Sequence, residues 1–292
     1  MARVLGWVAA LVGAFAAACH CPDALAQDRG AGDTGSAAAP VCDGAAIAGG
    51  TVNRISDGRG FILADGREVR LAGIEVPTLA QPQDAAPAPG GPAAKAALEA
   101  LAGGDRVVLR GADAGPDRYG RLVAYAYSER DGGDQAGDRL FVQGELVAAG
   151  FARVADRVGS QACASALLGR ENAARKAKLG LWADPYYDLL DAETPTVVLA
   201  HKGRFALVEG KVVSVRESGS TLYVNFGRRW SEDFAVTVRK RNERSFADAG
   251  LDLKGLEGRR VIVRGFVEAR GSRGMPSIEA ERPEQIESVD RD

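Results

Sequence analysis

Any chemistry in this chain must use carboxylates, arginines or tyrosines. The sequence has two histidines, His20 and His201, so neither a Ser-His-Asp triad nor a multi-histidine metal site can be assembled. One acid is notable for its position. The apolar run LAGIEVPTL, residues 71–79, stops at Glu75 and Pro77, which predicts a strand that carries a carboxylate at its end.

The elements around this acid are short strands in tight hairpins. Residues 50–77 contain three strand candidates, and Asp57-Gly58 and Asp65-Gly66 mark the turns between them. Helices are predicted over residues 93–104, 141–150 and 160–180, and further strands over 105–111 and 121–129. Ser160 is the expected N-cap of the last helix. Hairpins without βαβ alternation favour a small closed barrel of the OB type.

A second all-β pattern follows. Residues 205–227, 233–239 and 259–288 alternate apolar and polar residues, with one helical stretch over 242–250. We therefore predict a mainly β protein with helices (α+β): a five-stranded OB barrel with three helices, then a second OB-like barrel. The predicted domains are residues 42–190 and 198–290.

The first residues have the composition of an export signal. Residues 1–26 hold Arg3, an apolar run too short for a membrane span, and the small residues Ala24-Leu25-Ala26. We predict a signal peptide over 1–26, a flexible leader over 27–41 and a periplasmic or secreted protein. Lipidation at Cys19 is the weaker interpretation, since Ala16 stands where a leucine is usual. No later segment is long and apolar enough to span a bilayer.

Two cysteines remain after the predicted signal, Cys42 and Cys163. Because export leads to an oxidising compartment, we expect them to form a disulfide. The alternative is a pair of buried free thiols. Two cysteines do not make a metal site.

The charge is nearly balanced, with a formal net value of −2 for the whole chain. Residues 27–197 hold 18 Lys and Arg against 23 Asp and Glu, and residues 198–292 hold 18 against 15. Neither part is strongly basic. This argues against phosphate binding by a broadly charged surface, while a local basic patch remains open.

Five phrases in collinear order carry a family resemblance. They are ISDGRGFIL, VRLAGIEVP, DRYGRLVAYAY, LVAAGFARV and E-x-x-A-R-x-x-x-x-G-L-W at 171–182. Together, from about residue 50 to 188, they resemble the thermonuclease (staphylococcal-nuclease-like) family. The resemblance implies an OB barrel with three helices and a calcium-dependent phosphodiesterase active on DNA and RNA.

The resemblance also assigns roles to residues. Arg70 and Arg121 occupy the positions of the two arginines that bind and polarise the phosphate, and Glu75 takes the place of the acid at the strand end. Arg118 and Tyr119, in the DRYGR phrase, are the expected substrate-binding neighbours. The physical reason is that cations stabilise the negative charge that a phosphodiester gains in its transition state.

The sequence departs from the family at the metal and at the base. Arg59 stands where the first calcium-binding acid belongs, Thr78 replaces the acid that activates water, and Val76 replaces a threonine. Replacing an anionic ligand by a cation costs several kcal/mol, or more than about a thousandfold in metal affinity. We therefore expect no bound calcium or other cofactor, little calcium-dependent nuclease activity, and an Arg59–Glu75 salt bridge in the old metal position.

Several alternatives stay open from sequence. Arg70 and Arg121 either bind phosphate or pair with Glu75, Asp57 or Asp117 at a barrel rim. The chain is accordingly either an exported nuclease with altered metal use, or a non-catalytic binding or scaffold module of the cell envelope. Its partner is then a nucleic acid, through Arg70 and Arg121, or an envelope protein. Asp131, Asp134 and Asp138 predict a plain turn rather than a calcium loop.

Overall fold

A computed structural model describes residues 42, 44–79, 88–129 and 139–289. The predicted signal peptide, the leader and the aspartate turn at 131–138 lie outside the described residues, so these interpretations stay predictions. The limits predicted for the two domains also stay predictions.

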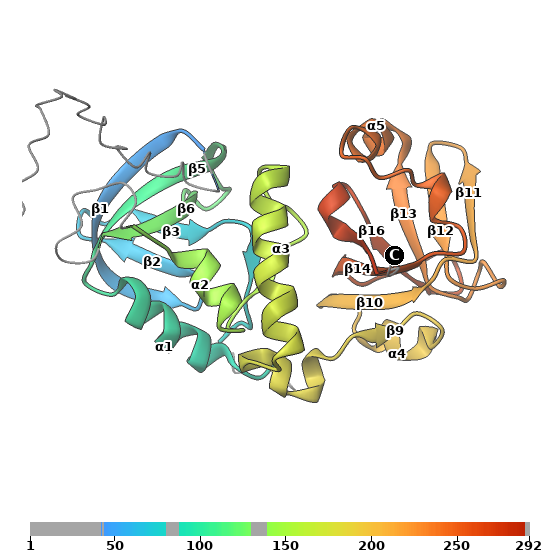
Figure 1. The fold of residues 1–292 in the computed structure, drawn as a ribbon, viewed down its shortest axis with the longest axis horizontal. Helices are drawn as coiled ribbons and strands as arrows, with labels where there is room; N and C mark the ends of the chain where they lie inside the picture. Colours follow the sequence, from blue (N-terminus) through green and yellow to red (C-terminus); the bar gives the residue numbers. More distant parts are fainter. Residues whose placement is uncertain (1–41, 43, 80–87, 130–138, 290–292) are drawn as a thin grey trace, which may run out of the picture. The chain divides into compact units, whose positions relative to one another are not determined.

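The described chain consists of runs of consecutive strands with helices inserted between them (Figure 1). The strands are β1 (Ala46–Asp57), β2 (Gly60–Leu63), β3 (Glu68–Leu71), β4 (Ile74–Glu75), β5 (Arg106–Pro116), β6 (Leu122–Glu129), β7 (Leu140–Phe141), β8 (Arg153–Val154), β9 (Leu190–Asp191), β10 (Phe205–Lys211), β11 (Ser214–Ser218), β12 (Thr221–Asn225), β13 (Ala235–Arg239), β14 (Arg260–Phe266), β15 (Glu268–Arg270), β16 (Met275–Glu279) and β17 (Ile286–Ser288). The helices are α1 (Gly91–Ala102), α2 (Val142–Ala148), α3 (Gln161–Lys176), α4 (Pro195–Ala200) and α5 (Lys240–Asp248), with 3₁₀ turns η2 (Gly180–Ala183), η3 (Pro185–Tyr187), η4 (Lys254–Leu256) and η5 (Pro283–Gln285).

The first sheet closes on itself. Its order is β3-β2-β1-β5-β6-β7, and β3 also pairs with β6. The β3–β6 pairing is parallel, with Val69 opposite Leu122, whereas the other pairs of this sheet are antiparallel. Helix α1 connects the β3–β4 segment to β5. A closed ring of five main strands with this helix is the predicted OB barrel.

The second set of strands repeats the same connectivity. Strands β10 and β11 are separated only by residues 212–213, and β14 and β15 only by Val267. Each pair is therefore one bent strand that passes from one sheet into the other. The two sheets have the strand orders β17-β14-β10-β9 and β11-β12-β13-β16-β15. Around the ring β13 and β16 are parallel, the added edge strand β9 is also parallel to β10, and α5 follows the third strand. The predicted second OB-like barrel is confirmed.

Each barrel has its own apolar core. Phe61, Leu98 and Leu109 are fully buried in the first core, and Leu222, Val236 and Phe246 in the second. These side chains come from alternate positions of strands and from one face of α1 and α5, as a period of two or of 3.6 residues requires. The cores fix which face of every strand points outward.

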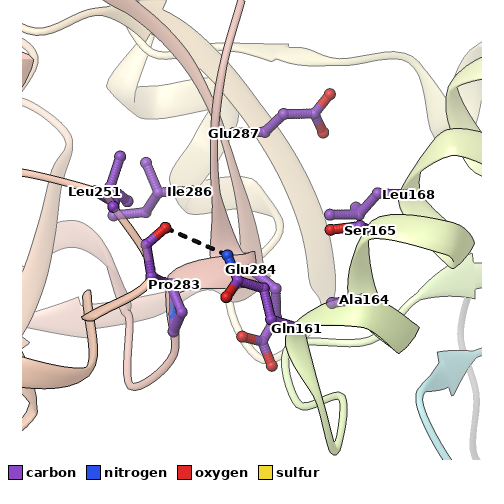
Figure 2. Close-up of a pocket in the computed structure, with 11 residues that line it drawn as sticks. Gln161, Ala164, Ser165, Leu168, Leu251, Pro283, Glu284, Ile286 and Glu287 are labelled. Atoms are coloured by element: carbon purple, nitrogen blue, oxygen red, sulfur yellow. Dashed lines mark hydrogen bonds between the residues drawn. The ribbon is translucent and has the colours of Figure 1, made fainter. Parts of the chain in front are cut away.

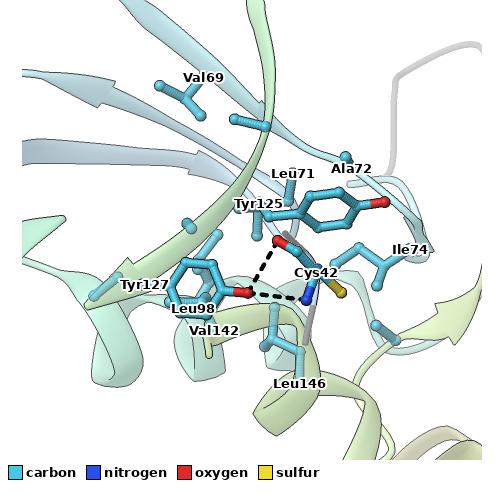
Figure 3. Close-up of a cluster of buried hydrophobic side chains, with 14 of the residues drawn as sticks. Cys42, Val69, Leu71, Ala72, Ile74, Leu98, Tyr125, Tyr127, Val142 and Leu146 are labelled. Atoms are coloured by element: carbon cyan, nitrogen blue, oxygen red, sulfur yellow. Dashed lines mark hydrogen bonds between the residues drawn. The ribbon is translucent and has the colours of Figure 1, made fainter. Parts of the chain in front are cut away.

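The disulfide between Cys42 and Cys163 joins the start of the described chain to α3. It was expected because an export signal was predicted, and the disulfide itself is confirmed. The Tyr127 hydroxyl lies beside Cys42, where it accepts from the Cys42 amide at 3.3 Å and donates to the Cys42 carbonyl at 3.2 Å (Figure 3). Ser160 caps α3 as predicted, because its hydroxyl accepts from the Cys163 amide at 3.2 Å.

A third apolar cluster includes side chains that follow α3 and side chains of β10 and β14. It contains Trp182, Tyr187, Phe205, Leu207 and Ile262. The described residues all lie in one compact unit, and this cluster links the two cores within it. Among the described residues, no helix is long and apolar enough to cross a membrane.

Candidate functional site

Glu75 is placed by two short strands. It ends β4, which pairs antiparallel with β8 so that Glu75 lies opposite Arg153. The chain turns into β4 at Gly73, whose φ of 72° is a conformation that favours glycine. Pro77 follows and has no N–H to continue the pairing. The Glu75 side chain is only 15% exposed.

Arg59 binds this acid. It lies in the turn between β1 and β2, and its Nη1 contacts both the Glu75 carboxylate and, at 2.9 Å, the carbonyl of Ile74. The Arg59 amide donates to Asp57 Oδ1 at 2.8 Å, which holds the turn in place. The predicted Arg59–Glu75 salt bridge is confirmed.

The electrostatic environment of Glu75 combines burial with several cations. Burial raises the pKa of Glu75 above its ordinary value, and the charges of Arg59, Arg153 and Arg70 act in the opposite direction. Asp156, in the segment after β8, also has a pKa raised mainly by burial, and Arg59 is among its charged neighbours. The site therefore holds two largely buried acids, Glu75 and Asp156, near a larger number of arginines.

Arg70 is paired with Asp57 and not with Glu75. Arg70 belongs to β3, the strand that pairs with both β2 and β6. Its Nη1 lies 2.8 Å from Asp57 Oδ2. Burial is the main cause that lowers the pKa of Arg70, followed by the charge of Arg59, and Arg121 contributes in the same direction. Arg70 thus lies close enough to Arg59 and to Arg121 for their charges to act on it.

Arg121 is paired with Asp117 in the turn before β6. Its Nε and Nη2 lie 2.8 and 2.7 Å from Asp117 Oδ2, and these bonds hold the pKa of Asp117 below its ordinary value. Tyr119 is 65% exposed. The guanidinium carbons of Arg118 and Arg121 lie 4.8 and 5.0 Å from its ring centre, and Arg118 donates to its hydroxyl at 2.8 Å. These side chains form an exposed rim beside Arg70.

The residues present do not fit a calcium ion. Calcium takes six to eight oxygen ligands, yet the Glu75 carboxylate is held by Arg59, and both Asp57 oxygens already accept hydrogen bonds, one from Arg59 and one from Arg70. In the part of the chain that the structure describes, no group of three or more His, Cys, Asp or Glu residues could hold a metal ion. Thr78 is exposed and carries no carboxylate to accept a proton.

Sequence reasoning missed Arg153. This buried residue donates from Nη1 to the Phe205 carbonyl at 3.1 Å. Its guanidinium lies 5.0 Å from the ring centre of Tyr187 and 4.9 Å from that of Phe205. Burial lowers its pKa. The only sequence signal was a charged residue between apolar neighbours in FARVA.

A second buried network was also missed. Arg264 of β14 and Glu171 of α3 are both fully buried and lie 2.7 Å apart. Glu171 accepts from the Val154 amide at 2.7 Å, and Arg264 donates to the Val154 carbonyl at 3.3 Å. Since β8 pairs with β4, strands of the second barrel hold the backbone beside Glu75.

A cavity of about 240 Å³ lies between α3 and residues 249–251 and 283–287 (Figure 2). Gln161 donates from its amide to the Ala249 carbonyl there at 3.3 Å. Both acids of the cavity are engaged, Glu284 by the Val158 amide and Glu287 by Asn172 and Arg264. The residues that line this cavity do not include Arg59, Arg70, Glu75 or Arg121.

The fold and the site together define a class of protein: a closed OB barrel that carries three arginines and an acid at the end of a strand. Residues 68–184 match the family model for the staphylococcal nuclease homologue. The chain therefore contains a domain of that family, as the resemblance indicated. The match includes Arg70, Glu75 and Arg121, and it ends before the second barrel. No curated protein matches the sequence at a significant level.

Proposed function

We propose that this is an exported nucleic-acid-binding protein built on a nuclease barrel, which binds the phosphate backbone without calcium and without cutting it. The observation that carries the proposal is the Arg59–Glu75 pair. An internal guanidinium neutralises the acid that would otherwise attract a divalent cation. To bind there, a metal ion would have to displace the Arg59 guanidinium from Glu75, and the two positive charges would repel each other.

The phosphate-binding capacity is assigned to Arg70 and Arg121. Each guanidinium has five N–H donors, and the carboxylate partners Asp57 and Asp117 occupy only some of them. These arginine side chains are 18% and 28% exposed, and because each is held by an acid it needs little reordering when it binds a phosphate. Tyr119 offers an exposed ring beside them on which a base can stack.

Loss of hydrolysis follows from two positions. Thr78 cannot act as a general base, which alone costs about 10²- to 10⁴-fold in rate. Glu75 is already bound by Arg59 and so is a poor base. Export is supported by the disulfide between Cys42 and Cys163, because such bonds persist in oxidising compartments.

The test is the binding of a labelled single-stranded oligonucleotide, followed by fluorescence anisotropy in the presence of a chelator. We expect binding by the wild type, and a weaker complex with a lower salt dependence, by about 0.7 in slope per arginine, in Arg70→Gln and Arg121→Gln. Arg67→Gln is the matched control, since Arg67 is an exposed arginine of the same barrel, paired with Asp65. An equal loss of oligonucleotide affinity in all three variants, or no binding by the wild type, would refute the proposal. The remaining function would then be a scaffold that binds an envelope protein.

A further inference from the structure

The second barrel presents one tryptophan to solvent. Trp230 is 76% exposed, more than any other large apolar side chain among the described residues. It lies in the tryptophan loop, residues 226–234, which connects β12 to β13. The other tryptophan of the described chain, Trp182, is buried.

The tryptophan loop is held in one conformation by its own polar contacts. Arg229 binds Asp233 through its amide at 2.8 Å and through its guanidinium at 3.1 Å. Arg273, from the turn between β15 and β16, donates to Ser231 at 3.3 Å and to Glu232 at 3.1 Å. The indole is therefore exposed on a braced turn, and little ordering entropy is lost when it binds a ligand.

A cation without a polar partner lies two residues before this indole in the sequence. No hydrogen bond or ion pair joins Arg228 to another residue within the described ranges, whereas Arg229 and Arg273 are paired with Glu232 and Asp233. The loop thus offers one available guanidinium two residues before the exposed ring.

A similar pair lies on the strand that leads into the loop. Arg216 of β11 stands directly opposite Tyr223 of β12. Both face away from the core, because the next residue of β12, Val224, is buried in it. Arg216 is exposed, Tyr223 is half-buried, and neither side chain has a polar partner in the described part of the chain.

We propose that this surface, formed by Arg216, Tyr223, Arg228 and Trp230, binds single-stranded nucleic acid as a second contact separate from Arg70 and Arg121. Flat rings stack on unpaired bases of any sequence, and guanidinium groups between them bind the phosphates. Two residues of β12, Val224 and Asn225, separate Tyr223 from the start of the loop, a rise of about 10 Å along the strand. The two pairs therefore belong to one short stretch of chain.

Charge favours this ligand over a lipid surface. A bilayer would require a contiguous apolar patch, yet Trp230 is flanked by Glu232 and Asp233. The surface beside the indole is therefore polar, not a contiguous apolar patch. A strand of nucleic acid can instead place its phosphates at Arg228 and Arg216 and its bases at the rings. The inference does not require binding at the first barrel.

The experiment is tryptophan fluorescence of the full chain titrated with an oligothymidine of about 12 nucleotides, within the range of OB barrel sites. We expect quenching that disappears in Trp230→Phe and persists in the Arg70→Gln/Arg121→Gln variant. Affinity, measured by anisotropy in that same double variant, should fall about 5- to 100-fold in Trp230→Ala and several-fold in Arg228→Gln. Arg244→Gln, at an exposed arginine of α5, should not change it.

Two results would overturn the inference. One is an unchanged affinity in Trp230→Ala on the double-variant background. The other is a Trp230 emission change with vesicles of anionic phospholipid but none with the oligonucleotide. Failure of the proposed function alone is distinguishable, because the wild type would then bind the oligonucleotide only through the Trp230 surface.

Discussion

Arg59 and Glu75 form an ion pair at the point where β4 ends, and the same guanidinium nitrogen also donates to the backbone carbonyl of Ile74 at 2.9 Å. The two side chains are 22% and 15% exposed. The pair therefore joins the turn after β1 to the strand-end acid. It leaves the site with an internal, permanently positive group.

Arg59→Met should destabilise the protein by roughly 2–4 kcal/mol, because it leaves Glu75 partly buried without its partner. Arg67→Met, which breaks the exposed pair with Asp65, should cost less than about 1 kcal/mol. Urea denaturation of the two variants measures both values. Equal losses would show that the Arg59–Glu75 pair is no stronger than a surface contact.

Arg59→Asp should make the protein respond to calcium. The new acid would stand near Glu75 and Asp57, so three carboxylates could contribute oxygen ligands to one ion. We expect a melting temperature that calcium raises in this variant but not in the wild type. Arg59→Asn removes the cation without adding an acid and is the control. A calcium response of the wild type equal to that of Arg59→Asp would refute the assignment of Arg59 as the substitute for the ion.

Glu75 should make the stability depend on pH. Its pKa is raised in the folded protein, mainly by burial, so the folded state holds this proton more tightly than the unfolded chain. Stability contributed by Glu75 is therefore fully present below the unfolded pKa, about 4.3, and is lost as pH rises through the folded pKa. The free energy of unfolding of the wild type minus that of Glu75→Gln should fall over this window in urea denaturation. A difference that grows with pH would contradict the raised pKa.

The buried pair of Arg264 and Glu171 should show strong coupling. Arg264→Met leaves Glu171 charged and fully buried, which costs about 3–5 kcal/mol. In Arg264→Met/Glu171→Gln the amide oxygen can still accept from the Val154 amide, so the double variant should be more stable than Arg264→Met alone. A double-mutant cycle by urea denaturation gives the coupling energy. Additive losses would contradict the account.

Much of the first barrel was predictable because its signals are local. Aspartate-glycine turns, the Ser160 cap and a hairpin period of two residues act over a few positions. The Arg59–Glu75 pair was predictable because a cation stood where the family resemblance placed an acid. The disulfide was expected from the predicted export signal and the two cysteines that remain after it.

The remaining features depend on tertiary packing. Three acids could have paired with Arg70, and only the registers of β1 with β2 and of β2 with β3 together place Asp57 beside it. The bond between Arg264 and Glu171 joins residues 93 positions apart. No local pattern distinguishes these two buried charges from the many exposed ones in the sequence.

We propose that Arg59 takes the place of a metal beside Glu75, and that this barrel therefore binds nucleic acid without cutting it. The most direct measurement is cleavage of single-stranded DNA by the purified protein with calcium and with a chelator. We predict no cleavage above the level of Arg121→Ala under either condition. Calcium-dependent cleavage by the wild type that Arg121→Ala abolishes would contradict the claim.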